Sequence, residues 1–330
     1  MRLLKLVPDN TNIDFLRWRN VAMAISVLMM AAAIATLWFK GLNLGVDFVG
    51  GQMAQVQFQQ PPQLDRLRAD VNSLDLGEAA VQEFGSNNRI LIRLPLPEGG
   101  DDAAANAAAA RVRQLIAQRY PGARFESVET VSGKVSGELL RAGALALLLS
   151  AIGISLYIWI RFEWQFGVGA LFSLFHDVTI TLGLLALTQL EFDLNVVAAL
   201  LTLIGYSLND TIVVYDRVRE NLRKYRKMEM AALLNLSANE TLSRTVATNV
   251  SMMLALGALF MLGPDVIYSF TVTLFFSVII GTYSTVYIAA PWLIWLKVTS
   301  DSFLPKAAPM TAAERLGQKP RNEVGDGARV

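Results

Sequence analysis

An acidic side chain interrupts one of the most apolar stretches of this chain. Asp210 follows Asn209 within residues 200–221, a segment that begins as an apolar helix and ends in charged residues. A carboxylate near the centre of a bilayer costs about 3 kcal/mol on insertion scales, so such groups usually face a partner or a water-filled path. Asp210 lies six residues before Asp216, which is about 9 Å from the polar end of the segment at the usual helical rise.

Proton exchange is the chemistry that suits such a carboxyl group. Burial favours its neutral form and a nearby cation favours its charged form, so movement of the cation can change its proton occupancy. We predict that Asp210 and its neighbour Asn209 belong to a proton-coupling site. The alternative is a structural role, in which Asp210 only joins helices through hydrogen bonds.

A basic residue that could pair with this carboxylate stands in the next apolar segment. Arg244 starts a polar stripe with Thr248 and Ser251 at helical spacing, and Thr245 and Asn249 lie beside the stripe. We predict that Arg244 is the cation of the proton-coupling site and that Thr248 and Ser251 join a polar interior. The alternative is an arginine at a helix end that extends its charge to the membrane surface.

A histidine and a second aspartate stand near the middle of the apolar residues 166–190. His176 and Asp177 are adjacent, so on a helix their side chains point about 100° apart and cannot serve one site in the same way. We expect Asp177 to join the polar interior. A histidine can titrate near neutral pH, but we interpret His176 as a hydrogen-bonding residue of the helix bundle.

A glycine-rich sequence, GLNLGVDFVGGQ, follows the first apolar segment. Gly45, Gly50 and Gly51 permit backbone angles that other residues avoid. A phosphate-binding loop is a poor interpretation, because the lysine and the following helix of that motif are missing. We predict a hinge between membrane and external domain.

The composition excludes several kinds of site. The chain has no cysteine and one histidine, so thiolate chemistry and a histidine-rich metal centre are excluded. Its net charge of +1 gives no general attraction to nucleic acid. We find no zinc-protease or serine-hydrolase motif and no nucleotide-binding loop. We therefore expect no enzyme activity, cofactor, metal or nucleotide, and any work would draw its energy from a proton gradient.

The elements that carry these residues are predicted to cross a membrane. The chain is 53% hydrophobic and only 17% charged, which is typical of a multi-pass membrane protein. Lysine and arginine gather at both ends and in the loop after the fourth span, so the positive-inside rule places both termini in the cytoplasm. The predicted organisation is a cytoplasmic segment 1–19, a first transmembrane helix 20–39, a periplasmic domain 40–137, transmembrane helices 2–6 within 138–296 with a basic cytoplasmic loop 217–241, and a cytoplasmic, disordered tail 297–330.

The domain between the first two spans alternates too strongly to lie in lipid. Strand patterns, a hairpin and two helical patterns follow one another in the order β-α-β-β-α-β, at residues 53–58, 62–74, 80–84, 89–94, 101–120 and 125–131. That order is typical of a ferredoxin-like α+β domain. The predicted fold class is therefore a multi-pass α-helical membrane protein of six transmembrane helices with a small ferredoxin-like periplasmic domain between helices 1 and 2.

Four sequence motifs resemble those of the SecF family, the smaller membrane subunit of the bacterial SecDF translocation factor. They are GYSLNDTIVVYDRVREN at 205–221, LSRT at 242–245, GLNLGVDFVGG at 41–51 and HDV at 176–178. The resemblance implies that Asp210 and Arg244 are the proton-linked carboxylate and the functional arginine. It also implies that the protein is located in the bacterial inner membrane and uses the proton-motive force.

The same resemblance implies the partners. These are SecD in a heteromeric complex, the SecYEG channel, YajC and YidC as further components, and an unfolded preprotein that is drawn out on the periplasmic side. Two other functions stay open from the residues alone. One is an exporter of small molecules or lipids, which needs an apolar pocket in the external domain, and the other is a scaffold for other membrane subunits.

Overall fold

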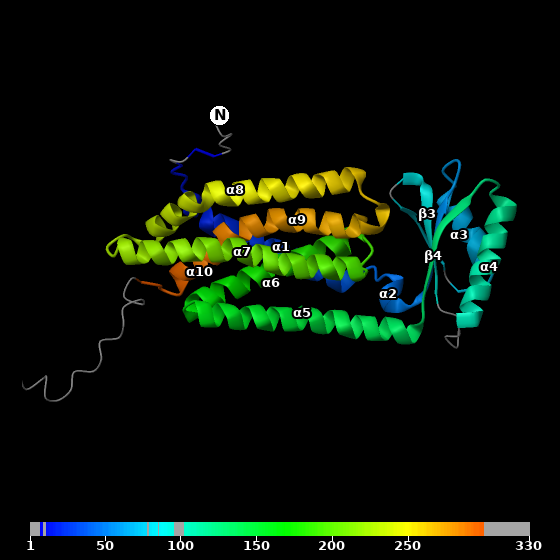
Figure 1. The fold of residues 1–330 in the computed structure, drawn as a ribbon, viewed down its shortest axis with the longest axis horizontal. Coiled ribbons are helices and arrows are strands. Elements are labelled where there is room, and N and C mark those ends of the chain that lie inside the picture. Colours follow the sequence, from blue (N-terminus) through cyan, green and yellow to red (C-terminus); the bar gives the residue numbers. More distant parts are fainter. Residues whose placement is uncertain (1–6, 9–10, 78, 85, 96–101, 300–330) are drawn as a thin grey trace, which may run out of the picture.

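A computed structural model describes residues 7, 8, 11–77, 79–84, 86–95 and 102–299. Figure 1 shows an elongated molecule in which a bundle of long helices occupies one end and a small α/β domain the other. The expectation of a disordered tail over 297–330 falls almost entirely outside the described residues, as does part of the N-terminal segment 1–19.

Six helical segments among the described residues are long and apolar enough to cross a bilayer, as predicted. The first joins a short 3-10 helix, η1 (Phe15–Trp18), to α1, and the last continues from α9 through the π-helical η3 into α10. The six segments are η1 with α1 (Arg19–Lys40), α5 (Gly133–Arg161), α6 (Trp164–Thr188), α7 (Leu194–Lys224), α8 (Met230–Leu262), and α9 (Tyr268–Ser284) with η3 (Thr285–Ala289) and α10 (Ala290–Trp295).

The π-helical turn in the last span has a local cause. Pro291 at the start of α10 has no backbone N–H, and its ring would clash with the carbonyl four residues earlier in a regular α-helix. A widened turn just before it lets the helix continue without that clash. The span therefore remains one continuous element of the bundle.

The bundle has inner and outer helices. More than half of the apolar window of α6, α7 and the α9 span is buried, against 17% or less in α1, α5 and α8. The buried residues that join the inner helices include Phe166, Leu203 and Tyr215, and the Tyr215 hydroxyl donates a hydrogen bond to the Ala289 carbonyl at 2.9 Å. Polar groups on the buried faces of these inner helices therefore lie within protein and not against lipid.

The basic segment 217–241 is mostly helical, and its prediction as a loop is wrong. Helix α7 continues to Lys224 and α8 already begins at Met230. Charged residues end the part of a helix that suits lipid, but arginine, glutamate and leucine are good helix formers and let the helix extend into water. An ion pair between Arg217 and Glu220, one turn apart, supports the extension.

The domain between the first two membrane-spanning segments has the predicted α+β fold. Its strands are β1 (Gly51–Gln57), β2 (Ala80–Phe84), β3 (Ser86–Leu94) and β4 (Arg124–Val131), and they form an antiparallel sheet in the order β2-β3-β1-β4. Helices α3 (Leu64–Asn72) and α4 (Asp102–Arg119) pack on one face of this sheet through an apolar core that includes Leu67, Ile90, Ile92, Val112 and Ile116. Strand β3 begins three residues earlier than predicted.

One short element between the bundle and the domain was not predicted. Helix α2 (Val46–Val49) follows Gly45, and it lies between the bundle and the sheet in Figure 1. Gly50 and Gly51 adopt φ values of 76° and 126°, which other residues rarely adopt. Gly45 has an ordinary φ of −71°, so its role is different.

Candidate functional site

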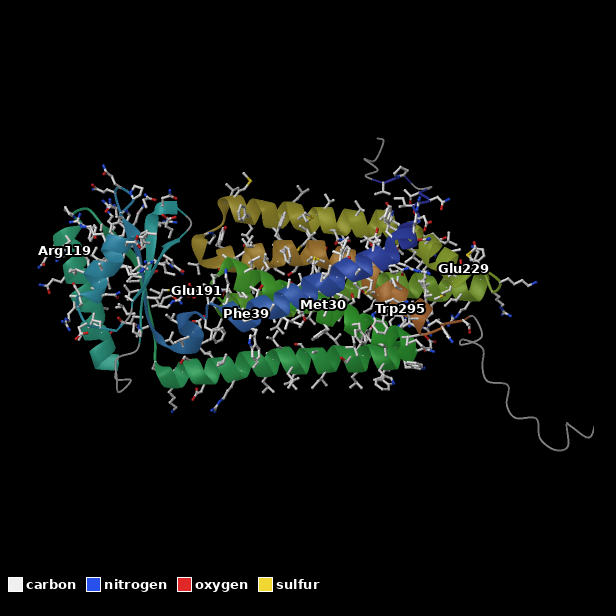
Figure 2. All side chains as sticks on the ribbon, turned by 180° about the vertical axis from the view of Figure 1, so that it is seen from behind. Met30, Phe39, Arg119, Glu191, Glu229 and Trp295 are labelled. Atoms are coloured by element: carbon white, nitrogen blue, oxygen red, sulfur yellow. The ribbon has the colours of Figure 1, made fainter. Side chains whose placement is uncertain are left out.

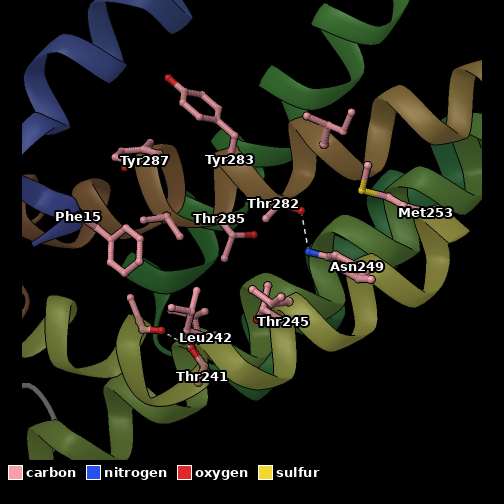
Figure 3. Close-up of a pocket in the computed structure, with 16 residues that line it drawn as sticks. Phe15, Thr241, Leu242, Thr245, Asn249, Met253, Thr282, Tyr283, Thr285 and Tyr287 are labelled. Carbon is pink, nitrogen blue, oxygen red and sulfur yellow. Dashed lines mark hydrogen bonds between the residues drawn. The ribbon is translucent and has the colours of Figure 1, made fainter. Parts of the chain in front are cut away.

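Asp210 lies on the inward side of α7, and its side chain contacts an amide of the neighbouring helix. The residue is 6% exposed, and Asn249 of α8 donates a hydrogen bond from Nδ2 to Asp210 Oδ2 at 3.2 Å. The same amide nitrogen donates to Thr282 Oγ1 of α9 at 2.6 Å, as Figure 3 shows, and Asn249 Oδ1 accepts from the Tyr206 hydroxyl at 2.6 Å. Asn249 of α8 therefore links α7, through Asp210 and Tyr206, with α9, through Thr282.

Arg244 acts on this carboxylate through space and not through a direct ion pair in the described structure. Its position on α8 is exposed, and it is five residues from Asn249, which places the two side chains on different sides of the helix. The predicted cation is thus near the site but outside the buried network. Asn209 is likewise exposed on α7, although its neighbour Asp210 is buried.

The prediction that Thr248 and Ser251 join the polar interior is wrong for this chain. Both positions are exposed, and their hydroxyls donate to carbonyls of their own helix, at Arg244 and Ala247. The buried face of α8 instead carries Thr241, Thr245 and Asn249 at a spacing of four residues. Because each residue turns a helix by about 100°, a stripe offset by one position faces away from the core.

A second buried carboxyl group lies at the centre of the inner helices. Asp177 of α6 is 0% exposed and accepts hydrogen bonds from Ser207 Oγ of α7 at 2.5 Å and Ser284 Oγ of α9 at 2.8 Å. Its Oδ1 lies 2.9 Å from His176 Nδ1, and Ser173 Oγ donates to Ser284. Asp177 therefore lies in the polar interior and connects α6, α7 and α9.

His176 is only partly satisfied by these contacts. Its Nε2 is buried and has no hydrogen-bond partner among the described residues, while the ring stacks on Tyr283 at a centroid distance of 6.1 Å. The expectation of a hydrogen-bonding histidine therefore holds for Nδ1 alone. Other side-chain hydrogen bonds between the inner helices join pairs of hydroxyl groups, such as those of Thr211 and Thr285 at 3.2 Å.

This arrangement can respond to a proton. An ionised carboxylate only accepts hydrogen bonds, whereas a protonated one also donates. Hydroxyl and amide groups can exchange donor and acceptor roles, so the network around Asp177 and Asp210 can adapt to either form. No group of three or more His, Asp or Glu side chains in the described part of the chain could hold a metal ion.

A cavity of about 560 Å³ opens beside Asn249, between α8 and α9. Its walls are mainly apolar and include Leu242, Met253 and Tyr283, and Asn249 and Thr282 are among the polar residues that line it. Helix α8 is therefore incompletely packed at the depth of the Asp210 contact. Loose packing leaves room for α8 to move relative to α9.

Sequence reasoning identified Asp210 and Asp177 but missed their direct partners. Asn249, Ser207 and Ser284 are single polar residues in apolar helices, and their spacing alone does not show which neighbour they face. A signal for Asn249 did exist, because Thr241, Thr245 and Asn249 recur every fourth residue and define a polar helix face.

The predicted hinge glycines lie together at the junction of bundle and domain. Gly45 precedes α2, and its backbone N–H donates to the Phe192 carbonyl at 2.9 Å. Gly50 follows α2, and Gly51 is the first residue of β1. Whether the chain bends there remains a prediction.

Comparisons with known proteins agree with this architecture. Residues 111–299 match the family described as "Protein export membrane protein SecD/SecF, C-terminal", and residues 36–62 match the "SecD/SecF GG Motif". The protein translocase subunit SecF of Pseudomonas aeruginosa is 41% identical over 307 residues, covering 92% of this chain and 97% of the relative. That of Cereibacter sphaeroides is 42% identical, covering 89% and 93%. These names describe transport components.

The fold is also similar to solved structures. The crystal structure of SecDF from Thermus thermophilus, described as a translocon-associated membrane protein, matches with a TM-score of 0.81 and 32% identity over 88% of this chain. A second structure, of SecDF in a super-membrane-facing form, matches with a TM-score of 0.65 over 87%. The chain spans 40% and 39% of those two SecDF chains. On these matches, the chain belongs to the SecD/SecF family of protein export membrane proteins and is a multi-pass membrane protein.

Proposed function

We propose that this chain is the SecF-type subunit of the Sec protein-export machinery. Together with SecD it uses the proton-motive force to promote translocation of secreted proteins through the SecYEG channel. It lies in the bacterial inner membrane with both termini in the cytoplasm and the ferredoxin-like domain in the periplasm. The observation that carries the proposal is the buried carboxyl group of Asp210, held by Asn249 between three helices.

A partner bundle is part of this proposal. Asn209 and Arg244 are polar, stand within helices of membrane-spanning length and are exposed on this chain. Polar groups at that depth usually face protein or a water-filled path and not lipid. The SecDF chain that matches here is more than twice as long, so a SecD subunit that covers these residues would complete the bundle.

The energy comes from the different contacts of the two protonation states. A charged Asp210 attracts Arg244 and accepts from Asn249, whereas a neutral one loses the charge interaction and gains a donor. Helix α8, beside the cavity, would then shift relative to α7 and α9. A proton drives the change only through its difference in free energy between the two states.

The available energy is adequate for such a switch. One elementary charge that crosses a potential of about 100 mV releases about 2.3 kcal/mol. At about 1.4 kcal/mol for each factor of ten, this shifts a two-state population by roughly 50-fold. A single carboxyl group can therefore bias the bundle strongly without any nucleotide.

The test is proton-dependent export in membrane vesicles that contain the complex. Asp210→Asn keeps the shape of the side chain but cannot change its charge, so we expect it to abolish the part of export that an imposed proton gradient stimulates. The matched control is Asp216→Asn, on the same helix, where the carboxylate is about half exposed and pairs with Arg161. Equal stimulation of the wild type and Asp210→Asn, with normal complex assembly, would favour the scaffold function and rule out the proton mechanism.

A further inference from the structure

The chain segment that leaves the membrane is fixed to a loop of the inner helices. Residues 41–45, here called the exit segment, run beside residues 189–193, the α6–α7 loop. The Phe192 N–H donates to the Asn43 carbonyl at 2.8 Å, the Gly45 N–H donates to the Phe192 carbonyl at 2.9 Å, and Leu44 and Phe192 form a parallel β-bridge. The exit segment is therefore paired through its backbone to the helix bundle.

An arginine of the external domain closes this contact. Arg93 of β3 forms an ion pair with Glu191 of the α6–α7 loop at 2.9 Å, with only 15% and 12% of the two side chains exposed. Its Nη1 also donates to Asn43 Oδ1 at 3.1 Å and to the Leu44 carbonyl at 3.0 Å. One guanidinium thus joins the sheet, the exit segment and the loop. Glu191 lies at the junction of domain and bundle in Figure 2.

The position of Gly45 is explained by this packing. A Cβ atom at Gly45 would lie 2.8 Å from Glu191 Oε1, which is the oxygen that pairs with Arg93, and 3.3 Å from the Phe192 carbonyl oxygen. A Cβ atom there would push the Glu191 carboxylate away from Arg93, so glycine suits this close approach of the exit segment to the loop. Gly45 therefore serves a close backbone contact, whereas Gly50 and Gly51, which come after α2, adopt positive φ values.

The contact continues directly into α7, the helix that carries Asp210. The Leu194 N–H donates to Asp47 Oδ2 of α2 at 3.0 Å, and Asp193 caps the helix by accepting from the Val196 N–H at 2.8 Å. The rings of Phe48 and Phe192 pack at a centroid distance of 5.6 Å, within an apolar cluster that includes Val196. The first turn of α7 is thus held by polar and apolar contacts together.

Arg93 offsets the negative charge that gathers at this junction. Four carboxyl groups gather here: Asp47 of α2, Glu129 of β4, and Glu191 and Asp193 of the α6–α7 loop. Burial raises the pKa of Glu191, the charges of Asp193 and Asp47 raise it further, and Arg93 opposes them. Without Arg93, Glu191 would be a buried acid among like charges, and the loop would be free to separate from the domain.

We infer that Arg93, Glu191 and the backbone pairing of Leu44 with Phe192 form a rigid coupling that transmits displacement of α7 to the external domain. This inference rests on the proposed function, in which protonation of Asp210 moves α7 relative to its neighbours. Arg93 is a positioning residue in this scheme. The coupling stays closed throughout the cycle, so the external domain follows α7 at this junction and does not bend away from it.

The first test locks the coupling. The chain has no cysteine, so Leu44→Cys with Phe192→Cys introduces a single possible disulfide, and paired strands about 5 Å apart suit its geometry. In vesicles with an imposed proton gradient, we expect the oxidised double variant to export as well as the same variant after reduction. A loss of export on oxidation that a reductant restores would show that the contact must open, and would overturn the inference.

The second test breaks the coupling. We expect Arg93→Glu and Glu191→Arg each to reduce gradient-stimulated export at least tenfold, and the double variant with exchanged charges to recover most of it. The matched control is Arg89→Ala, on the same strand, whose partner Glu126 lies in the domain and not in the loop. Co-purification with the SecD subunit checks that each variant assembles.

The two proposals fail in different ways. Normal export by Arg93→Glu, with Asp210→Asn inactive in the same vesicles, would remove the coupling and leave the proton mechanism intact. Normal export by Asp210→Asn would remove the proton mechanism itself. The disulfide test does not depend on how well the Arg93 variants fold.

Discussion

Replacing Asn249 with leucine tests whether the bundle depends on this amide as the structure indicates. Leucine has nearly the same size but cannot form the hydrogen bonds to Asp210, Tyr206 and Thr282. The Thr282 hydroxyl keeps its own hydrogen bond to the Val278 carbonyl at 2.7 Å, so losing the bond from Asn249 costs little stability at Thr282. The cost therefore arises mainly at the Asp210 carboxyl group and the Tyr206 hydroxyl.

The expected magnitude follows from those two contacts. Side-chain hydrogen bonds between membrane helices contribute about 0.6 kcal/mol on average and about 1.7 kcal/mol at most. Two such bonds give a loss of about 1–3 kcal/mol in the free energy of unfolding. The cavity beside Asn249 limits any steric cost of the leucine, because space is available there.

Reversible unfolding in mixed micelles, followed by the fluorescence of the six tryptophans, measures this difference. Ser251→Leu is the control, because Ser251 is on the same helix but is exposed and bonds only to its own backbone among the described contacts. We expect the control to unfold like the wild type. Equal stability of Asn249→Leu and Ser251→Leu would refute the assignment of Asn249 as the connecting residue.

Three further predictions concern other parts of the molecule. Asp177→Ala leaves the donors of Ser207 and Ser284 without their shared acceptor, so it should destabilise the bundle by at least as much as Asn249→Leu in the same unfolding assay. Burial and the hydrogen bond to Asp70 raise the pKa of Tyr120 from 10.0 to about 12. The protonated hydroxyl is therefore favoured in the folded domain, and its stabilisation is complete below pH 10 and lost as the pH rises to about 12. Tyr120→Phe should remove that step from an alkaline unfolding titration, and an unchanged titration would contradict the contact. Gly183→Val should weaken the packing of α1, because a Cβ atom at Gly183 would collide with Ala33, and unchanged thermal stability in detergent would exclude that contact.

The features that the sequence predicted correctly depend on local patterns. Six apolar segments of sufficient length could only form membrane helices, and the alternation of strands and helices in residues 40–137 determined a ferredoxin-like domain. Local patterns fail where the polarity of a segment and its helix propensity indicate different ends for an element. Arg217 and the basic residues after it end the lipid-exposed part of α7, yet the helix continues to Lys224 because its residues still favour helix.

The candidate site shows a different limit. The depth of Asp210 and Asp177 follows from residue counting, but the side of the helix that each neighbour presents depends on packing between helices. A rotation of one residue, about 100°, separates the expected stripe of Arg244, Thr248 and Ser251 from the buried one that contains Asn249. A single sequence does not determine which of these two helix faces packs against the bundle.

The junction of bundle and domain was beyond sequence reasoning for a similar reason. Glycines near the end of a membrane helix suggest flexibility, but Gly45 is explained by Glu191, almost 150 residues away in the chain. Arg93 gave no signal at all, since arginine is common on domain surfaces. Its importance follows only from the loop that it contacts.

Proton flux tests the central claim most directly. The chain is reconstituted with the proposed SecD partner into proteoliposomes, a proton gradient is imposed, and a pH-sensitive dye inside the vesicles records the flux. We predict that the wild type and Asp216→Asn relax the gradient at the same rate, and that Asp210→Asn relaxes it no faster than empty vesicles. Flux through Asp210→Asn equal to that of the wild type would contradict the assignment of this carboxyl group as the one that carries the proton.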